Sequence, residues 1–133
     1  MKKILLTLLC ALPVLGFAEV AKISPADTAK LVAEGKAVLV DVREPAEWLE
    51  SGVAAPAVLL PKSEFDDGRA GGWNDFLAKV GDKEIIIYCR SGKRSDAVAK
   101  ALAEKGHPVA NAGGFKDWQA AGLPTRKPTE PGK

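Results

Sequence analysis

The sequence predicts an α/β domain with a mainly parallel sheet of about five strands flanked by helices. Along the chain, apolar stretches of strand length alternate with stretches in which apolar residues recur at helical spacing, which is the order typical of such sheets. Residues 85–88 contain three consecutive isoleucines and no polar alternation, as expected of a strand that is covered on both faces. The chain has 133 residues, 47% of them hydrophobic, which is enough for one core and too few for two.

The elements before this central strand follow from local signals. Ser24, Pro25 and Asp27 form a start signal for a helix, because they supply a cap residue, a proline in the first turn and an acid at its N-terminal end. The helix is expected to end near Gly35, and residues 37–42 follow as an apolar strand. Expected next are a short helix at 45–51, a short strand at 57–60, turns at 66–68 and 71–72, and an amphipathic helix from Trp73 to Gly81.

Residues 84–106 are expected to form a strand, a tight loop and a helix. Apolar residues recur at the spacing of one helix face from Ala97 to Leu102, Ser95 is expected to cap this helix, and Gly106 is expected to end it. The rest of the chain is expected to contain a strand at 108–112, a turn at 113–114, a last helix at 115–121 and a disordered tail at 125–133. The folded domain would then span residues 19–124.

The N-terminal residues 1–18 have the pattern of a bacterial secretory signal peptide. Two lysines precede an apolar run, and Gly16 and Ala18 are small residues at the first and third positions before a cut after Ala18. The pattern predicts a periplasmic protein. Pro13 interrupts the apolar run, which is shorter than the roughly 20 residues of a spanning helix, so no membrane anchor is expected after cleavage. Cleavage would leave 17 basic and 17 acidic side chains, and this neutral balance gives no reason to expect nucleic acid as a partner.

Cys89 is the candidate nucleophile. It is expected at the carboxyl end of the central strand, facing the N-terminus of the next helix, where Gly92 lets the backbone turn tightly. Loop amides and the helix dipole supply positive partial charge, and Arg90, Lys93 and Arg94 add full charges. A lone buried cysteine is usually a small hydrophobic residue, but these surroundings favour the thiolate and predict a reactive thiol. Because Cys10 would leave with the signal peptide, Cys89 would be the only thiol of the mature protein and could form no intramolecular disulfide.

Other candidate residues are fewer. Asp41 and Arg43 end the strand at 37–42, at the same edge as Cys89 if the strands are parallel, and they are interpreted as a structural ion pair or, alternatively, as support for the rim of the site. His107 precedes a proline and is interpreted as a surface or turn residue. One thiol and one histidine make a metal site improbable, and the sequence contains no nucleotide-binding glycine motif, so no cofactor is expected.

Three stretches resemble the rhodanese family of sulfurtransferases. The segment CRSGKRS at residues 89–95, preceded by IIIY, is similar to the active-site loop of that family. The segment DVR at 41–43 resembles its Asp-Val-Arg segment, and GGFKDW at 113–118 resembles its closing Gly-Gly-Phe-x-x-Trp. The resemblance implies a rhodanese-like fold and an exported, single-domain sulfurtransferase.

The activity that this resemblance implies is transfer of sulfane sulfur through a Cys89 persulfide. An anionic donor such as thiosulfate would load Cys89, the loop of Arg90, Ser91, Gly92, Lys93, Arg94 and Ser95 would bind the anion, and cyanide, a thiol or a partner protein would accept the sulfur. One alternative is a persulfide carrier or sulfur-binding module with little turnover of its own. A cysteine phosphatase is disfavoured, because such enzymes have five residues between cysteine and arginine, whereas four separate Cys89 from Arg94.

Overall fold

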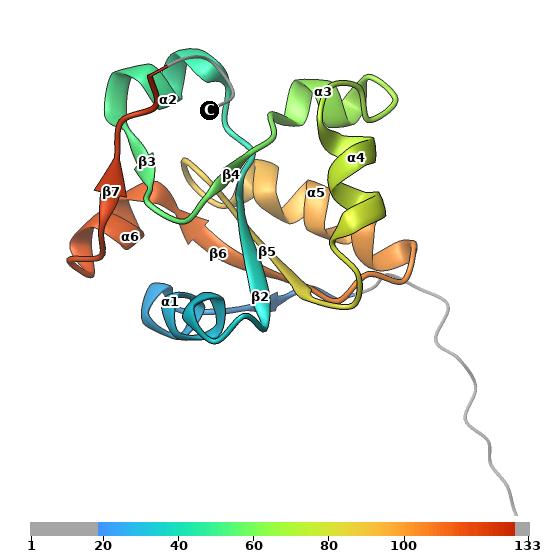
Figure 1. The fold of residues 1–133 in the computed structure, drawn as a ribbon, viewed down its shortest axis with the longest axis horizontal. Helices are drawn as coiled ribbons and strands as arrows, with labels where there is room; N and C mark the ends of the chain where they lie inside the picture. Colours follow the sequence, from blue (N-terminus) through green and yellow to red (C-terminus); the bar gives the residue numbers. More distant parts are fainter. Residues whose placement is uncertain (1–18, 130–133) are drawn as a thin grey trace, which may run out of the picture.

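Five parallel strands form the central sheet of the protein, in a computed structural model that describes residues 19–129 (Figure 1). Their order in the sheet is β1-β6-β5-β2-β4. The strands are β1 (Ala21–Lys22), β2 (Ala37–Asp41), β4 (Val58–Leu59), β5 (Glu84–Cys89) and β6 (Val109–Gly114). The predicted α/β class and the parallel five-stranded sheet are therefore confirmed.

Strand β5 lies at the centre of the sheet, between β2 and β6. Its residues from Ile85 to Cys89 are all buried, which explains why the strand lacks polar alternation. Near its carboxyl end, the pairing with β6 shifts register, so that Ile87 pairs with Asn111 but Tyr88 pairs with Gly113. Such irregularities bend the strand that carries the extra residue. Here that residue is Ala112 of β6, opposite the bond between Ile87 and Tyr88.

Helices cover both faces of the sheet (Figure 1). One face carries α1 (Pro25–Ala33), α2 (Pro45–Ser51) and α6 (Phe115–Ala120), whose apolar residues join a core cluster with Leu39 and Ile86. The other face carries α3 (Lys62–Asp66), α4 (Trp73–Lys79) and α5 (Lys93–Glu104), packed on a cluster that includes Ile85 and Ile87. Alternate residues of β5 thus feed opposite cores, as the pleat of a strand requires.

The expectation of a disordered tail from residue 125 is wrong for its first residues. Thr125 and Arg126 form strand β7, which pairs antiparallel with β3 (Val53–Ala54) in a second, two-stranded sheet. The Arg126 side chain also donates from Nε to the Ala55 carbonyl at 3.0 Å and from Nη2 to the Ala57 carbonyl at 2.8 Å. These hydrogen bonds order a segment whose composition alone is typical of disorder.

Several short elements were not predicted. Strands β1, β3 and β7 have two residues each, and α3 has five, which is too short to show a period in the sequence. Gly113 and Gly114, expected to form a turn, are instead the last residues of β6. The longer predictions hold: α2 spans 45–51 as expected, and α4 begins at Trp73, whose indole is fully buried.

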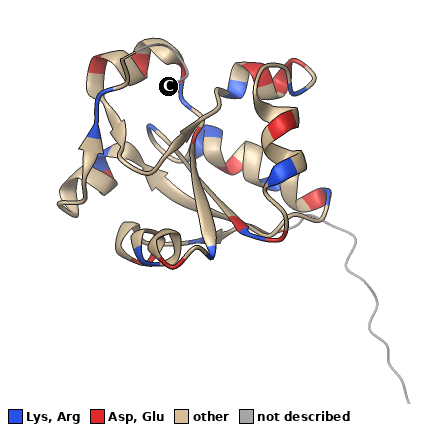
Figure 2. Ribbon diagram, in the orientation of Figure 1, with Lys and Arg blue, Asp and Glu red and all other residues tan. Residues whose placement is uncertain are grey.

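Charged residues lie on the helices and loops around the sheet, whereas the middles of the strands carry none (Figure 2). No helix between residues 19 and 129 is both long and apolar enough to cross a membrane. The signal peptide expected at residues 1–18 lies outside the part of the chain that the structure describes.

Candidate active site

Cys89 is the last residue of β5, and its side chain joins the core cluster beneath α5. The residue has no solvent exposure. Its Sγ accepts hydrogen bonds from the Gly92 amide at 3.0 Å and from both the amide and the hydroxyl of Ser95 at 3.4 Å. The sulfur therefore lies inside a cradle of donors that the loop and the first turn of α5 provide.

This cradle determines the protonation of Cys89. Burial by itself raises the pKa of the thiol, because a thiolate is poorly solvated in the core. Hydrogen bonds from the Ser95 hydroxyl and from the amides of Ser95, Gly92 and Ser91 act in the opposite direction and together lower the pKa below its ordinary value. The site thus favours the thiolate, the form in which cysteine is a nucleophile.

The helix after the loop does not begin as predicted. Helix α5 starts at Lys93, and its N-cap is Gly92 in the left-handed region at a φ of 96°, with no side-chain cap. Ser95, expected to be the cap, lies within the first turn and is fully buried. Its hydroxyl points inward to Cys89 instead of capping the helix. The sequence does not distinguish a serine that caps a helix from one that faces the core. The two cases differ in where the helix begins, which only the structure shows.

The loop lies directly against β6. A Cβ added at Gly92 would lie 3.4 Å from the Gly113 Cα, and a Cβ at Gly114 would collide with the Arg90 carbonyl oxygen. Close backbone packing therefore requires glycine at 114, whereas Gly92 needs glycine for its left-handed φ of 96°. The Gly-Gly pair of β6 is thus part of the cradle that holds the cysteine loop.

Asn111 of β6 is a site residue that the sequence analysis missed. Its Nδ2 donates to the Gly92 carbonyl at 3.0 Å, and its Oδ1 accepts from the Gly113 amide at 3.0 Å and from the Ser95 hydroxyl at 2.8 Å. The side chain is buried. The signal available in the sequence was a single polar residue among small and apolar ones, two positions before the Gly-Gly pair.

Glu47 of α2 was also missed. Its carboxylate accepts hydrogen bonds from Nη1 and Nη2 of Arg94 at 2.8 Å and 2.9 Å, in a two-pronged ion pair. Hydrogen bonding to Arg94 is the main reason that the pKa of Glu47 falls to about 2, although burial raises it. The charge of Arg94 is therefore partly neutralised by a helix that lies 47 residues earlier in the chain.

The other two cations of the loop, Arg90 and Lys93, are exposed and line two different cavities. Arg90 and Ser91 line a cavity of about 430 Å³ between the loop, α2 and α6, whose wall also includes Glu50 and Lys116. Lys93 lines a separate cavity of about 460 Å³ on the β6 side of the loop. Among the described residues, neither Arg90 nor Lys93 forms an ion pair. The loop thus has open positive charge on two sides.

Asp41 and Arg43 form a buried ion pair at the carboxyl end of β2. The guanidinium donates from Nε to Oδ1 at 3.1 Å and from Nη2 to Oδ2 at 2.8 Å, and it also donates to Ser51 Oγ and the Gly52 carbonyl at 2.9 Å. The guanidinium carbon of Arg43, Cζ, lies 4.4 Å from the centroid of the Phe115 ring. The pair thus ties β2 to the end of α2, in agreement with the structural interpretation, while Arg43 also reaches the wall of the cavity beside Arg90.

The other titratable residues include the side-chain types that bind metal ions. Within residues 19–129, no group of three or more histidine, cysteine, aspartate or glutamate side chains is placed to hold a metal ion. His107 lies in the loop before β6, at the amino ends of the parallel strands, whereas Cys89 lies at their carboxyl ends.

Several known proteins are similar to this chain in sequence. The family model described as "Rhodanese-like domain" matches residues 24–121. The thiosulfate sulfurtransferase GlpE of Actinobacillus succinogenes is 33% identical over 107 residues, which cover 77% of this chain and 87% of that protein. An uncharacterized protein of Synechocystis is 31% identical over 107 residues, covering 79% of this chain, but the match spans only 55% of that relative's length.

Solved structures agree on the fold. The polysulfide-sulfur transferase homodimer of Wolinella succinogenes is 27% identical with a TM-score of 0.64, over 84% of this chain and 81% of that one. A Rhodopseudomonas palustris protein of unknown function, described as a possible tyrosine phosphatase, is 28% identical with a TM-score of 0.68, over 80% of this chain and 85% of that one. With a family model that matches nearly the whole described domain, this chain belongs to the rhodanese-like family.

Proposed function

We propose that this protein is a sulfurtransferase that carries sulfane sulfur as a persulfide on Cys89. The observation that supports the proposal is the donor cradle around the Cys89 sulfur, at the end of a strand and in a loop rich in positive charge. Relatives that are named as sulfurtransferases support the same class of reaction.

The donor proposed here is a small anion with a sulfane sulfur, such as thiosulfate. The Cys89 thiolate attacks the outer sulfur, a new S–S bond forms, the S–S bond of thiosulfate breaks, and sulfite leaves with the electron pair. The cradle lowers the pKa of the Cys89 thiol, so this step uses the thiolate and needs no separate general base. A mechanism without a histidine base agrees with the position of His107, which lies at the opposite ends of the strands from Cys89.

The second half of the reaction passes the outer sulfur to a nucleophile. Cyanide or a thiol attacks that sulfur, and the Cys89 thiolate leaves with its electron pair, which restores the starting state. The cavity beside Arg90 and Ser91 has room for a small acceptor of this kind. A protein acceptor is the alternative, and the chain would then work as a carrier.

Two observations argue against a phosphatase. Only four residues separate Cys89 from Arg94, one fewer than a phosphate-encircling loop needs. In addition, Arg94 is engaged by Glu47, whereas a phosphatase needs the equivalent guanidinium for its substrate.

The test is the variant Cys89→Ser. It is expected to keep its fold and to lose sulfur transfer from thiosulfate, because a hydroxyl of ordinary pKa is a far weaker nucleophile than a thiolate. Intact mass after incubation with thiosulfate should show one added sulfur on the unsubstituted protein and none on the variant.

Steady-state turnover with cyanide or a thiol then distinguishes an enzyme from a carrier, because a carrier would load sulfur once and stop. Equal turnover in both proteins would refute the assignment of Cys89.

We also propose that the protein is exported to the periplasm, on the basis of the signal pattern of residues 1–18. The mature chain is expected to begin at Glu19, because Gly16 and Ala18 have the spacing that signal peptidase recognises. Intact mass of protein recovered from the periplasmic fraction is the measurement. Full-length chain retained in the cytoplasm would contradict export.

A further inference from the structure

The Ser95 hydroxyl lies between two acceptors. Its Oγ is 3.4 Å from the Cys89 sulfur and 2.8 Å from Oδ1 of Asn111, and all three residues are buried. A serine hydroxyl has one proton to donate. It can therefore donate to the sulfur or to the amide oxygen, but not to both at once.

The amide of Asn111 is held so that its oxygen faces Ser95. Nδ2 donates to the Gly92 carbonyl and Oδ1 accepts from the Gly113 amide, each at 3.0 Å. Reversing the amide would bring a donor against the Gly113 N–H and an acceptor against the Gly92 carbonyl, which loses both bonds. The acceptor offered to Ser95 is therefore permanent, and the state of the sulfur decides which way the hydroxyl proton points.

A charged acceptor outcompetes a neutral one. Hydrogen bonds to ionised groups are about twice as strong as those between neutral groups, so a thiolate should draw the Ser95 proton away from the amide. A neutral sulfur is a weak acceptor, and the proton should then return to Asn111. Without Asn111 the buried hydroxyl would lack a good acceptor whenever the sulfur is neutral, which is costly.

We propose that Asn111 is a positioning residue of the sulfur site, which accepts the Ser95 proton when the Cys89 sulfur is uncharged and releases it when that sulfur is a thiolate. Its effect on the thiol itself does not depend on the proposed function. Its effect on turnover does, because in a Cys89 persulfide the charge lies on the outer sulfur and the inner one is neutral. Asn111 then stabilises the loaded state, because its Oδ1 accepts the hydrogen bond that the Ser95 hydroxyl no longer donates to the inner sulfur.

Other charges around Cys89 do not produce this effect. Arg94 of α5 acts on the thiolate through its charge, but it is paired with Glu47 of α2. At the carboxyl end of β2, the neighbouring charges are the ion pair of Asp41 and Arg43. On α6, Asp117 accepts from the Gly114 amide, and on the β6 side Lys93 is open to solvent. None of these groups touches the Ser95 hydroxyl, so changes that act through Ser95 can be separated from theirs.

The experiment is a double-mutant cycle on the thiol pKa with Asn111→Ala, Ser95→Ala and the double variant. The thiolate is followed by its ultraviolet absorbance against pH, and each curve is corrected with the same variant carrying Cys89→Ser, which cancels Cys10 and Tyr88. Asn111→Ala should lower the thiol pKa, because the hydroxyl can then serve only the sulfur. Ser95→Ala should raise it, and the double variant should match Ser95→Ala.

A merely structural role predicts the opposite. If Asn111 only holds the loop at Gly92, its loss should loosen the amide cradle, raise the thiol pKa, and do so in the Ser95→Ala background as well. An unchanged or raised pKa in Asn111→Ala, or a shift that persists without Ser95, overturns the proposal. Asn74→Ala is the matched control, since Asn74 is an exposed asparagine on α4.

A second measurement covers the case in which Asn111→Ala does not fold. In the unsubstituted protein, the side-chain carbonyl carbon of Asn111 is followed by NMR through the titration of Cys89. Its resonance should shift in step with the thiolate absorbance, and most of that shift should vanish in Ser95→Ala although Cys89 still titrates. A resonance that does not move, or that moves equally in both proteins, overturns the proposal. Neither measurement uses a sulfur donor, so their outcome is independent of the proposed activity.

Discussion

At the scale of the residue, the basic side chains of the cysteine loop differ in what holds them. Arg94 is half-buried and bound by both oxygens of Glu47, whereas Lys93 is exposed and forms no ion pair among the described residues. Removing Arg94 would leave the Glu47 carboxylate unpaired beside the loop, where it repels an anion. Removing Lys93 takes away only a solvated charge, and such charges contribute little and are screened by salt.

We therefore expect Arg94→Ala to weaken the use of thiosulfate more than Lys93→Ala does. The activation free energy obtained from kcat/KM should rise by about 1–3 kcal/mol for Arg94→Ala, the range for leaving the partner of a hydrogen bond unsatisfied, here the Glu47 carboxylate. For Lys93→Ala the rise should be below about 1 kcal/mol and should fade at high salt. The measurement is kcat/KM for thiosulfate at low and high ionic strength, with Lys105→Ala as the control for net charge. A normal donor step in both variants would mean that these cations serve a protein partner or solubility.

At the scale of the element, helix α2 connects the helix that follows the cysteine loop to α3. Glu47 holds Arg94 of α5, and Glu44 at the start of α2 accepts from the Ser63 amide at 3.2 Å and from its hydroxyl at 2.7 Å, which links α2 to α3. Helix α2 has only seven residues and depends on tertiary contacts for its stability. Its acidic residues thus hold the start of α5 and α3 to the same short helix.

The variant Glu47→Gln tests this clamp. Because Arg94 lowers the pKa of Glu47 to about 2, the ion pair contributes stability that is complete above the ordinary pKa near 4.5 and is lost as the pH falls toward 2. Unfolding measured by urea between pH 7 and pH 2 should therefore show a smaller pH dependence in Glu47→Gln than in the unsubstituted protein. The freed Arg94 should also lower the thiol pKa of Cys89. Glu104→Gln, an exposed position on α5, is the control, and identical pH profiles for all three proteins would show that the clamp is energetically silent.

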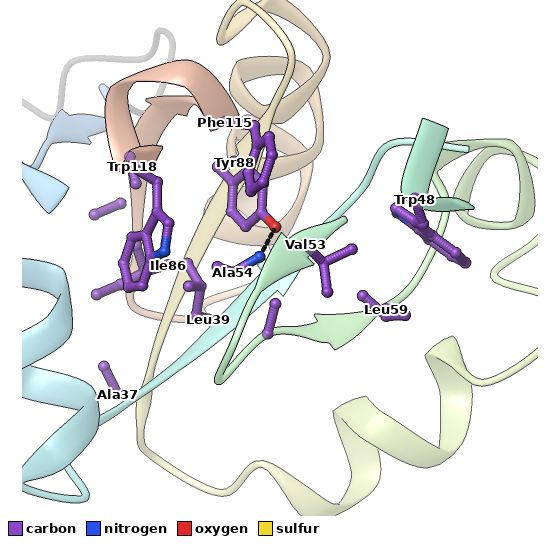
Figure 3. Packing of buried hydrophobic residues seen from close by; sticks show 13 residues of the cluster. Ala37, Leu39, Trp48, Val53, Ala54, Leu59, Ile86, Tyr88, Phe115 and Trp118 are labelled. Atoms are coloured by element: carbon purple, nitrogen blue, oxygen red, sulfur yellow. Dashed lines mark hydrogen bonds between the residues drawn. The ribbon is translucent and has the colours of Figure 1, made fainter. Parts of the chain in front are cut away.

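At the scale of the whole molecule, the small sheet of β3 and β7 is attached to the main sheet through Tyr88. Figure 3 shows the Tyr88 hydroxyl accepting a hydrogen bond from the Ala54 amide, at 3.0 Å, with the Phe115 ring stacked beside it. Burial raises the pKa of Tyr88, so the phenol stays neutral. This contact connects residues that lie 34 positions apart and closes the face of the domain that α2 and α6 cover.

Tyr88→Phe should destabilise the protein by about 1–3 kcal/mol, because it keeps the ring but leaves the buried Ala54 amide without an acceptor. The free energy of unfolding in urea measures this loss. Thr125→Ala, an exposed residue of β7 that pairs through its backbone, should change it by less than about 0.5 kcal/mol. An equal stability of Tyr88→Phe and the unsubstituted protein would show that water replaces the hydroxyl and that the small sheet is held by other contacts.

Some features of this protein were determined by the sequence alone. Three isoleucines before Cys89, a glycine in the loop and a helical period after it are local patterns, so they predicted β5, the loop, α5 and the position of the candidate nucleophile. Only the tertiary structure decided what surrounds the sulfur. Asn111 and Glu47 lie on β6 and α2, far from Cys89 in the chain, and parallel pairing and helix packing bring them to the same edge of the sheet. Local patterns report what a segment does by itself, whereas the partner of a buried donor or charge depends on which segments become neighbours.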